Sequence, residues 1–312
     1  MLETILSTAN NTTKHLVSIK DLKRDDFDQL MKLAHEAEHG KLINTLNDKI
    51  IASCFFEAST RTRLSFEAAI HRLGAKVIGF ADAHNTSFGK KGESLSDTIQ
   101  MLNGYADAIV MRHFEAGSAE IAANISRIPV VNAGDGSNEH PSQTLLDLFT
   151  IEQKFEQIDG IKIAMIGDLR YGRTVHSLSY ALLNYRDITI YYVAPKALQI
   201  PEEILAQLKN KNVAVHCVEN LADVIGVVDV LYMTRLQKER FSEEDGGHTM
   251  DYVLTADMLV NNAHDDLIVM HPLPRVQEIC NSVDATEYAW YFQQARNGVF
   301  MRQAILYSLL NI

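Results

Sequence analysis

The stretch FFEASTRTRLSFEAA, residues 55–69, lies between an apolar run and a helical pattern. Residues 49–56, KIIASCFF, have the length and composition of a buried strand, and residues 60–73 place apolar side chains at near-helical spacing before Gly74. Three hydroxyls and two guanidinium groups occupy the corner between these elements: Ser59, Thr60, Arg61, Thr62 and Arg63. The corner predicts a strand that leads directly into a helix whose N-terminus is crowded with hydrogen-bond donors.

The alternation of strands and helices continues along the chain. Further strands are predicted at residues 76–80, 107–112, 129–134, 161–167, 188–194, 213–218, 229–235 and 267–272. Helical patterns lie near residues 93–103, at 140–155 and at 287–311, the last with a break near Asn297 and Gly298. Such alternation is typical of parallel sheets with helices on both faces.

Two series of strands predict an α/β fold class with two doubly wound parallel-sheet domains linked by long helices. We expect the first domain to span residues 1–139, with the C-terminal helix, about 290–312, packing back on it. The second domain is expected to span residues 140–289. In sheets of this kind ligands bind at the carboxyl ends of the strands, and most of the polar motifs in this chain follow strands.

Composition narrows the class of protein. Among 312 residues, 40 acids stand against 29 bases, and the net charge of −11 argues against a nucleic-acid partner. No apolar run approaches the ~18–20 residues of a membrane span, and the N-terminus lacks the basic region of a secretory signal. Three scattered cysteines favour buried thiols in a reducing cytosol over disulfides or a metal site. A cytoplasmic protein is therefore expected.

The donor-rich corner has two interpretations. A single hydroxyl such as Ser59 can cap a helix, and the arginines can be ordinary solvated side chains. Two arginines and two further hydroxyls exceed what a cap needs. The planar guanidinium of arginine can donate two parallel hydrogen bonds to a phosphate or a carboxylate. The pattern G-x-x-x-x-G-K-[ST] is absent and no G-x-G-x-x-G follows a strand, so neither a nucleoside triphosphate nor a dinucleotide is indicated. A phosphate cradle of another kind is favoured.

Together with other motifs, this corner resembles the aspartate and ornithine carbamoyltransferase family. Ser-Thr-Arg-Thr-Arg after a strand is similar to the family's carbamoyl-phosphate motif, and residues 271–275, HPLPR, are similar to its aspartate-specific members. Similar motifs follow in the family's order at 111–113 (MRH), 132–148 (NAGDGSNEHPSQTLLDL), 167–178 (GDLRYGRTVHSL) and 233–240 (MTRLQKER). The resemblance covers most of the chain and is closest to catalytic chains that assemble with separate regulatory chains.

The resemblance implies a site for carbamoyl phosphate. It assigns Thr62, Arg112 and His140 to the oxyanion that forms when an amine attacks the carbonyl, and Gln143 to the carbamoyl amino group. It also implies a cis bond between residues 273 and 274. The full set of binding residues that it implies is Ser59, Thr60, Arg61, Thr62, Arg112, His140, Gln143, Leu273 and Pro274.

The resemblance also implies a cationic site for a dicarboxylate amine. It places Arg173, Arg235 and Gln237 on aspartate carboxylates, together with Lys91, which is also counted as catalytic. Ser87 and Lys91 are expected to enter the active site from a neighbouring subunit. Charge agrees with aspartate, because the distal ammonium of ornithine would call for an acidic or neutral group at Arg235.

Resemblance and residue chemistry lead to one expected reaction. Carbamoyl phosphate and L-aspartate would give N-carbamoyl-L-aspartate and phosphate, in de novo pyrimidine (UMP) biosynthesis, without a metal or organic cofactor. The expected partners are the two substrates, two further copies in a homotrimer with shared sites, and zinc-containing regulatory chains that would complete a dodecamer. Two alternatives stay open: a carbamoyltransferase with another amine acceptor, and a non-catalytic phosphometabolite-binding protein on the same fold.

Overall fold

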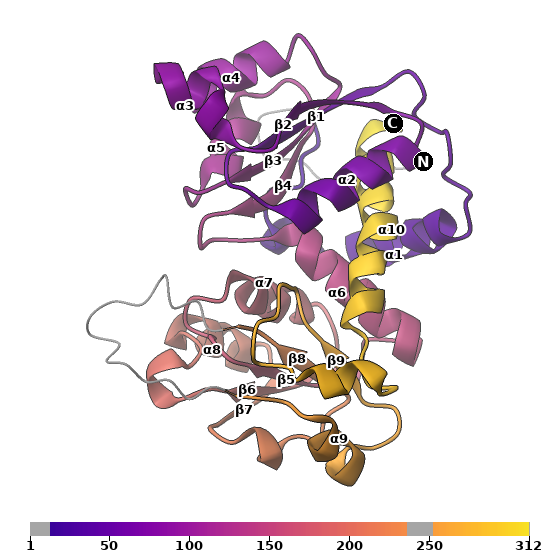
Figure 1. Ribbon diagram of the computed structural model, residues 1–312, viewed down its shortest axis with the longest axis vertical. Helices are drawn as coiled ribbons and strands as arrows, with labels where there is room; N and C mark the ends of the chain where they lie inside the picture. Colours follow the sequence, from indigo (N-terminus) through magenta and orange to yellow (C-terminus); the bar gives the residue numbers. More distant parts are fainter. Residues whose placement is uncertain (1–12, 236–251, 312) are drawn as a thin grey trace. The chain divides into compact units, whose positions relative to one another are not determined.

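The computed structural model describes residues 13–235 and 252–311 (Figure 1). It divides into two compact units. The first comprises Met1–Phe149 and Arg296–Ile312, and the second comprises Thr150–Ala295. Each unit is an α/β layer structure built on its own parallel sheet, which is the predicted fold class.

The first unit contains a four-stranded sheet in the order β2-β1-β3-β4. All neighbouring strands are parallel. The predicted strands are confirmed to within a residue or two at each end. Their bounds are β1 Ile50–Phe55, β2 Lys76–Phe80, β3 Ala108–His113 and β4 Val130–Asp135.

Helices cover both faces of this sheet, as Figure 1 shows with α4 and α5 on one side and α2 on the other. Ala52 and Cys54 of β1 pack in a core with α4 and α5. Ser53, between them in sequence, faces α2 and donates to Oε1 of Glu67 at 3.3 Å. The helices begin and end at α1 Arg24–Glu38, α2 Thr60–Arg72, α3 Ser87–Lys91, α4 Leu95–Leu102, α5 Ser118–Ile125 and α6 Pro141–Phe155.

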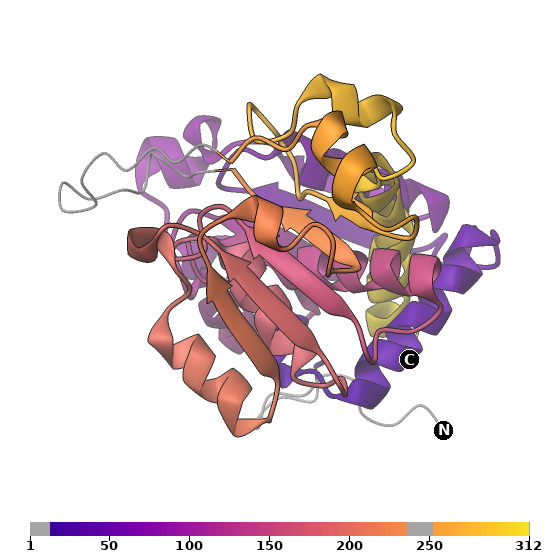
Figure 2. The same cartoon turned by 90° about the horizontal axis from the view of Figure 1, so that it is seen from below.

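The second unit contains a five-stranded parallel sheet in the order β7-β6-β5-β8-β9, whose strands lie side by side in Figure 2. One face packs on α9 through Ile166, Leu231 and Val269, and the other carries Tyr192, whose hydroxyl lies 2.6 Å from Oγ of Ser179 in α7. The strands are β5 Lys162–Ile166, β6 Thr189–Val193, β7 Ala214–Val218, β8 Val230–Met233 and β9 Ile268–Met270. The helices are α7 Arg173–Leu182, α8 Glu202–Asn210 and α9 Ala256–Asn262. The last helix, α10 Tyr291–Leu310, begins in this unit and from Arg296 onward belongs to the first.

The C-terminal helix corrects one expectation. A break was predicted near Asn297 and Gly298, but α10 runs without interruption from Tyr291 to Leu310. A Cβ on Gly298 would lie 2.1 Å from Nη1 of Arg302 and 3.1 Å from Cδ2 of Leu146. This glycine is therefore explained by close packing within the helix and against α6, and not by a change of backbone direction.

Two further elements differ from the expectations. Helix α1, which the strand and helix patterns did not include, is amphipathic and buries Phe27, Leu30, Met31 and Ala34 at helical spacing. The expected burial of all three thiols is wrong: each is free, but only Cys54 is buried, whereas Cys217 is exposed and Cys280 is intermediate. Among the described residues, none of the helices is both long enough and apolar enough to cross a bilayer.

Candidate active site

The first group of site residues lies where the order of the first sheet reverses. The chain leaves β1 for β2 on one side and later returns to β3 on the other side of β1. The loops after β1 and β3 therefore diverge, and open α/β sheets bind ligands at such a switch point. The register places Arg112 of β3 beside Phe55 of β1, so Arg112 lies at the carboxyl edge from which the 56–59 segment leads to α2.

Helix α2 begins at the donor-rich corner. Ser59 occupies the N-cap position with extended backbone, but its side chain makes no capping hydrogen bond, so a simple cap does not account for this hydroxyl. Thr62 is buried in the first turn. Arg63 pairs instead with Glu67 one turn along, with Nη1 2.9 Å from Oε1, so its guanidinium is held by its own helix. The helix N-terminus itself favours an anion.

Arg112 is fixed by an acid from the same corner. Its Nε donates to Oε2 of Glu57 at 2.8 Å, and its carbonyl accepts from the N–H of Phe56 at 2.8 Å. Opposite Arg112 the register of β3 and β4 shifts, because Met111 pairs with Asn132 whereas His113 pairs with Asp135. Irregularities of this kind redirect side chains at the ends of strands and are common beside active sites.

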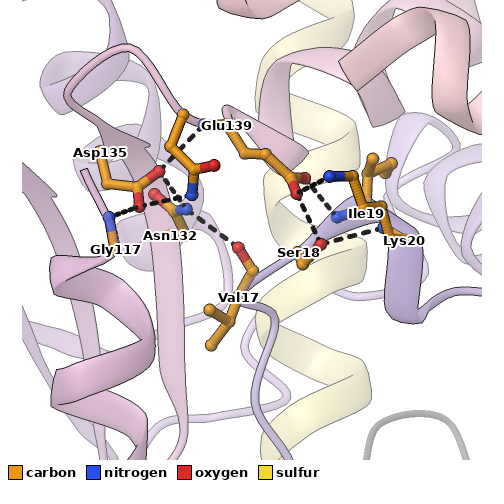
Figure 3. A network of polar contacts seen from close by, with 9 residues as sticks. Val17, Ser18, Ile19, Lys20, Gly117, Asn132, Asp135 and Glu139 are labelled. Carbon is orange, nitrogen blue, oxygen red and sulfur yellow. Dashed lines mark hydrogen bonds and ion pairs between the residues drawn. The ribbon is translucent and has the colours of Figure 1, made fainter. Parts of the chain in front are cut away.

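A buried polar network holds the loop from β4 to α6 (Figure 3). Asp135 accepts from the N–H of Gly117 at 2.9 Å, from Nδ2 of Asn132 at 2.9 Å and from the N–H of Glu139 at 3.1 Å. Glu139 in turn accepts from Oγ of Ser18 at 2.7 Å. Burial raises the pKa of Glu139, against the opposing effect of its hydrogen bonds. The loop is thus tied to two distant segments, at Ser18 and at Gly117, just before His140.

Gly136 is required by the shape of this loop. Its φ is +51°, and a Cβ would lie 2.7 Å from the N of Ala116 and 2.9 Å from the O of Phe114. Its N–H donates to the carbonyl of His113 at 2.9 Å. Backbone therefore approaches backbone at this point, which any side chain would prevent.

His140 and Gln143 stand at the start of α6 and are buried. Nδ1 of His140 lies 3.4 Å from Oγ of Ser142. Nε2 of Gln143 donates to Oδ1 of Asp147 at 2.8 Å. Both side chains are thus held by neighbours on their own helix.

The second unit has a matching switch point between β5 and β8. Arg173 is the first residue of α7 after β5 and is buried. Asp168, also buried, shapes the intervening turn by accepting from the N–H of Tyr171 at 2.9 Å. The strand expected at residues 229–235 ends at Met233, so Arg235 lies just beyond β8. Its side chain is half-buried. Gln237 lies outside the described residues.

The HPLPR segment follows β9 and is braced by a histidine. The N–H of Leu273 donates to Nδ1 of His271 at 2.8 Å, so Nε2 carries the proton and donates to Oε1 of Glu278 at 2.8 Å. The Leu273–Pro274 bond is cis, as the resemblance implied. Arg275 pairs with Asp284, and its Nη1 donates to the hydroxyl of Tyr291 at 2.9 Å, which gives it a structural role.

Ser87 and Lys91 stand on the short helix α3 in the first unit, and both are exposed. Phe88 anchors this segment: its ring centroid lies 5.0 Å from that of Phe56 and 5.8 Å from that of His113. The segment is thus docked on the strand ends of its own unit while its polar side chains face outward.

The structure brings together the residues of the first unit expected to bind carbamoyl phosphate, at one edge of one sheet: Ser59, Thr60, Arg61, Thr62, Arg112, His140 and Gln143. Leu273, Pro274, Arg173 and Arg235 belong to the second unit, at the carboxyl ends of β9, β5 and β8. Several supporting residues carried no signal in a single sequence, because their partners are distant or one turn away: Asp135, Asp147, Glu278 and Arg302. Among the described residues, no group of three or more His, Cys, Asp or Glu side chains is arranged to hold a metal ion.

Comparisons with known proteins show the family of this chain. Residues 14–153 match the family model for the aspartate/ornithine carbamoyltransferase carbamoyl-P binding domain, and residues 159–309 match that for the Asp/Orn binding domain. The catalytic subunit of M. jannaschii aspartate transcarbamoylase is 45% identical, with a TM-score of 0.88 over 95% of this chain and 98% of that chain.

A second solved structure carries both substrates. Aspartate transcarbamoylase from Trypanosoma cruzi in complex with carbamoyl phosphate and aspartate is 40% identical, with a TM-score of 0.89 over 99% of this chain and 100% of that chain. The same enzyme has also been solved with carbamoyl aspartate and phosphate, at 41% identity and a TM-score of 0.88 over 99% of this chain and 100% of that chain. On its matched domains, its fold and its overall identity to these proteins, the chain belongs to the aspartate/ornithine carbamoyltransferase family.

Proposed function

We propose that this chain is an aspartate carbamoyltransferase, which transfers the carbamoyl group of carbamoyl phosphate to the amine of L-aspartate. The observation that carries the proposal is the switch point between β1 and β3, where a helix N-terminus and Arg112 share one edge of the sheet. Its other support is the identity to enzymes solved with both substrates. The pathway that would use the product is de novo pyrimidine (UMP) synthesis.

Carbamoyl phosphate matches the first unit in charge and in geometry. The phosphate takes hydrogen bonds from the N-terminus of α2 and from Ser59, Thr60 and Arg61. The carbonyl oxygen faces Thr62, Arg112 and His140. The carbamoyl amino group donates to Gln143 and to backbone carbonyls at Leu273 and Pro274.

The reaction needs no covalent intermediate on the protein. The aspartate amine attacks the carbonyl carbon, the C–N bond forms, and the carbonyl oxygen becomes an oxyanion. When the tetrahedral intermediate collapses, the C–O bond to phosphate breaks and its electron pair leaves with the phosphate. The departing phosphate accepts the proton that the amine loses. Donors aimed in advance at the oxyanion supply most of the acceleration.

The second unit provides cations for the two carboxylates of aspartate. Arg173 is held at the start of α7 and Arg235 follows β8, while Gln237 and Lys91 complete the proposed set. Ornithine carries an ammonium where aspartate carries its distal carboxylate. A guanidinium at that point therefore attracts aspartate and repels ornithine.

The proposed assembly is supported by the exposure of Ser87 and Lys91. We place these side chains in the active site of a neighbouring copy, which makes the working unit a homotrimer with shared sites. Zinc-containing regulatory chains would join such trimers into a dodecamer. The compartment that we propose is the cytoplasm.

A panel of amine acceptors tests the activity. Initial rates of phosphate release from carbamoyl phosphate are measured with L-aspartate, L-ornithine and L-glutamate, and the carbamoylated product is identified by mass. We expect turnover with L-aspartate and background rates with the other two. Turnover with ornithine alone would assign a different carbamoyltransferase, and phosphate release without any acceptor would assign a hydrolase.

A further inference from the structure

Gln143 is oriented by an ionisable group one turn along its own helix. Nε2 of Gln143 donates to Oδ1 of Asp147 at 2.8 Å, and both side chains are buried. An ionised carboxylate only accepts hydrogen bonds, so the amino end of the amide must face Asp147. The carbonyl end, Oε1, is consequently presented on the opposite side of the amide as an acceptor.

A buried arginine lies within electrostatic range of that carboxylate. Arg302 of α10 is 3% exposed and interacts electrostatically with Asp147. Burial lowers the pKa of Arg302 to about 10, and the charge of Asp147 acts in the opposite direction. At neutral pH Arg302 therefore remains a cation, which favours the ionised form of Asp147 over the protonated form that could donate.

The position of Arg302 is set by close packing. Its Cζ lies 4.9 Å from the centroid of the Phe66 ring in α2, within range for a cation–π contact. A Cβ on Gly298 would come within 2.1 Å of Nη1, so the glycine leaves the room that the guanidinium occupies. Arg302 thus belongs to α10, whereas Asp147 and Gln143 belong to α6, whose first residues are site residues.

We propose that Asp147 and Arg302 are a positioning pair that sets the polarity of the Gln143 amide, so that its oxygen accepts from the amino group of the bound carbamoyl moiety. The role of Gln143 rests on the proposed function, whereas the orientation of its amide rests on the contacts above. The reverse orientation would turn one NH₂ group toward another. The pair therefore contributes to selecting a carbamoyl group over an acyl group of the same shape, since a methyl group donates nothing to the oxygen.

Two stable ligands measure this selectivity without turnover. Phosphonoacetamide carries an amide next to its phosphonate, and acetonylphosphonate carries a methyl ketone of nearly the same shape. The readout is the ratio of their Kd values, determined by calorimetry. Because the ratio compares two ligands on one protein, a general loss of stability or of phosphate affinity cancels.

The experiment is a double-mutant cycle on the full chain with Asp147→Asn and Gln143→Ala. In the wild type we expect the amide ligand to bind roughly tenfold or more tightly than the ketone, in line with one buried hydrogen bond. Gln143→Ala should bring the ratio close to one. Asp147→Asn should lower it only part of the way, because the Asn amide can either accept from or donate to Gln143 and so no longer fixes one orientation. The double variant should match Gln143→Ala. Leu309→Ala, elsewhere on α10, is the control for destabilisation and should retain the wild-type ratio.

A second variant covers the case in which Asp147→Asn fails to fold. Asp147→Asn combined with Arg302→Met removes both charges, so that neither is left buried and unpaired. We expect this variant to recover melting temperature and still to show the lowered ratio. Recovery of selectivity along with stability would overturn the positioning role, as would an equal ratio in the wild type or independent losses from Asp147 and Gln143. If the proposed function alone fails, the wild type makes no carbamoylated aspartate although the amide preference remains.

Discussion

Arg112 and Glu57 are joined by an ion pair of 2.8 Å between Nε and Oε2, and they come from the ends of two adjacent strands, β3 and β1. The Arg112 side chain is only 14% exposed. An arginine in this setting loses little freedom when it meets a ligand, because its acid partner already holds the guanidinium in place. The pair thus connects the donor-rich corner with the strongest candidate for oxyanion stabilisation.

Removal of the Arg112 guanidinium tests that role. Arg112→Ala should lower kcat by about 10²–10³-fold, the range measured when one preorganised oxyanion donor is lost. Arg72→Ala, at the exposed end of α2, is the matched control and should keep its activity. Circular dichroism confirms that both variants are folded, and an unchanged kcat in Arg112→Ala would remove it from the oxyanion site.

Glu57→Gln tests the orienting contact separately. The amide oxygen can still accept from Nε of Arg112, but the charge is gone, so we expect a smaller loss in kcat of about tenfold. Glu57→Ala should lose more, because it leaves the arginine without this partner. Steady-state rates at saturating carbamoyl phosphate give both values, and equal rates in the two variants would show that the contact does not orient Arg112.

Mixing two inactive variants tests whether active sites are shared. Lys91→Ala and Arg112→Ala should each be nearly inactive, because each lacks one half of every site. When the two are unfolded together and refolded, mixed trimers contain some sites with neither substitution. We expect activity to reappear in the mixture, and native mass spectrometry to show trimers. No recovery in verified mixed trimers would mean that each subunit uses its own Lys91.

The His271–Glu278 contact predicts a pH-dependent stability. Burial by itself raises the pKa of Glu278, but hydrogen bonds from His271 and from backbone N–H groups outweigh it and lower the pKa from 4.5 to about 2. A lowered pKa in the folded state stabilises the protein above about pH 4.5, and this stabilisation is lost as pH falls toward 2. Glu278→Gln should therefore cost about 2–3 kcal/mol at pH 7 and less at pH 3.5.

Denaturant unfolding at the two pH values measures the difference. Glu287→Gln, an exposed carboxylate near the start of α10, serves as the control and should change stability by less than about 0.5 kcal/mol at both. If Glu278→Gln costs the same stability at pH 7 and at pH 3.5, the negative charge of Glu278 does not contribute to folding stability.

The thiols provide a test of the core. Burial raises the pKa of Cys54 to about 12, so this thiol is neither ionised nor accessible in the folded protein. Burial raises the pKa of Cys217, whereas hydrogen bonds from Ser282 lower the pKa of Cys280. We therefore expect a thiol reagent at pH 8 to modify Cys280 first, the exposed Cys217 next, and Cys54 only at the rate of unfolding. Peptide mapping distinguishes the sites, and fast labelling of Cys54 in the native protein would contradict its placement in β1.

Most strands were predictable because their evidence is local. Residues 162–166 are a short apolar run bounded by turn residues, and a buried parallel strand needs nothing more. Residues 76–80 were found by the same local pattern, although they form an edge strand with exposed and half-buried side chains. The donor-rich corner was predictable for a similar reason, since five polar side chains in sequence end up at one helix terminus. The register between Phe55 and Arg112 could not be read, because it depends on the crossover that brings β3 beside β1.

The expectations from sequence failed where contacts between distant segments decide the structure. Gly298 was expected to break α10 because glycine weakens helices by about 1 kcal/mol relative to alanine, but packing against Arg302 and Leu146 decides the outcome. The burial of Cys217 was inferred from the small, odd number of scattered cysteines, yet Cys217 lies on β7, an edge strand with an exposed face. Asp147 and Arg302 gave no local signal because 155 positions of sequence separate them.

The central claim is tested most directly by a competition between acceptors. Carbamoyl phosphate labelled with ¹³C at the carbonyl is offered to the wild-type protein with equal concentrations of L-aspartate and L-ornithine, and the label is followed by NMR. We predict that the label moves to N-carbamoyl-L-aspartate with one phosphate released for each transfer. Label in the carbamoylated ornithine, or phosphate release with no labelled amine product, would contradict the assignment.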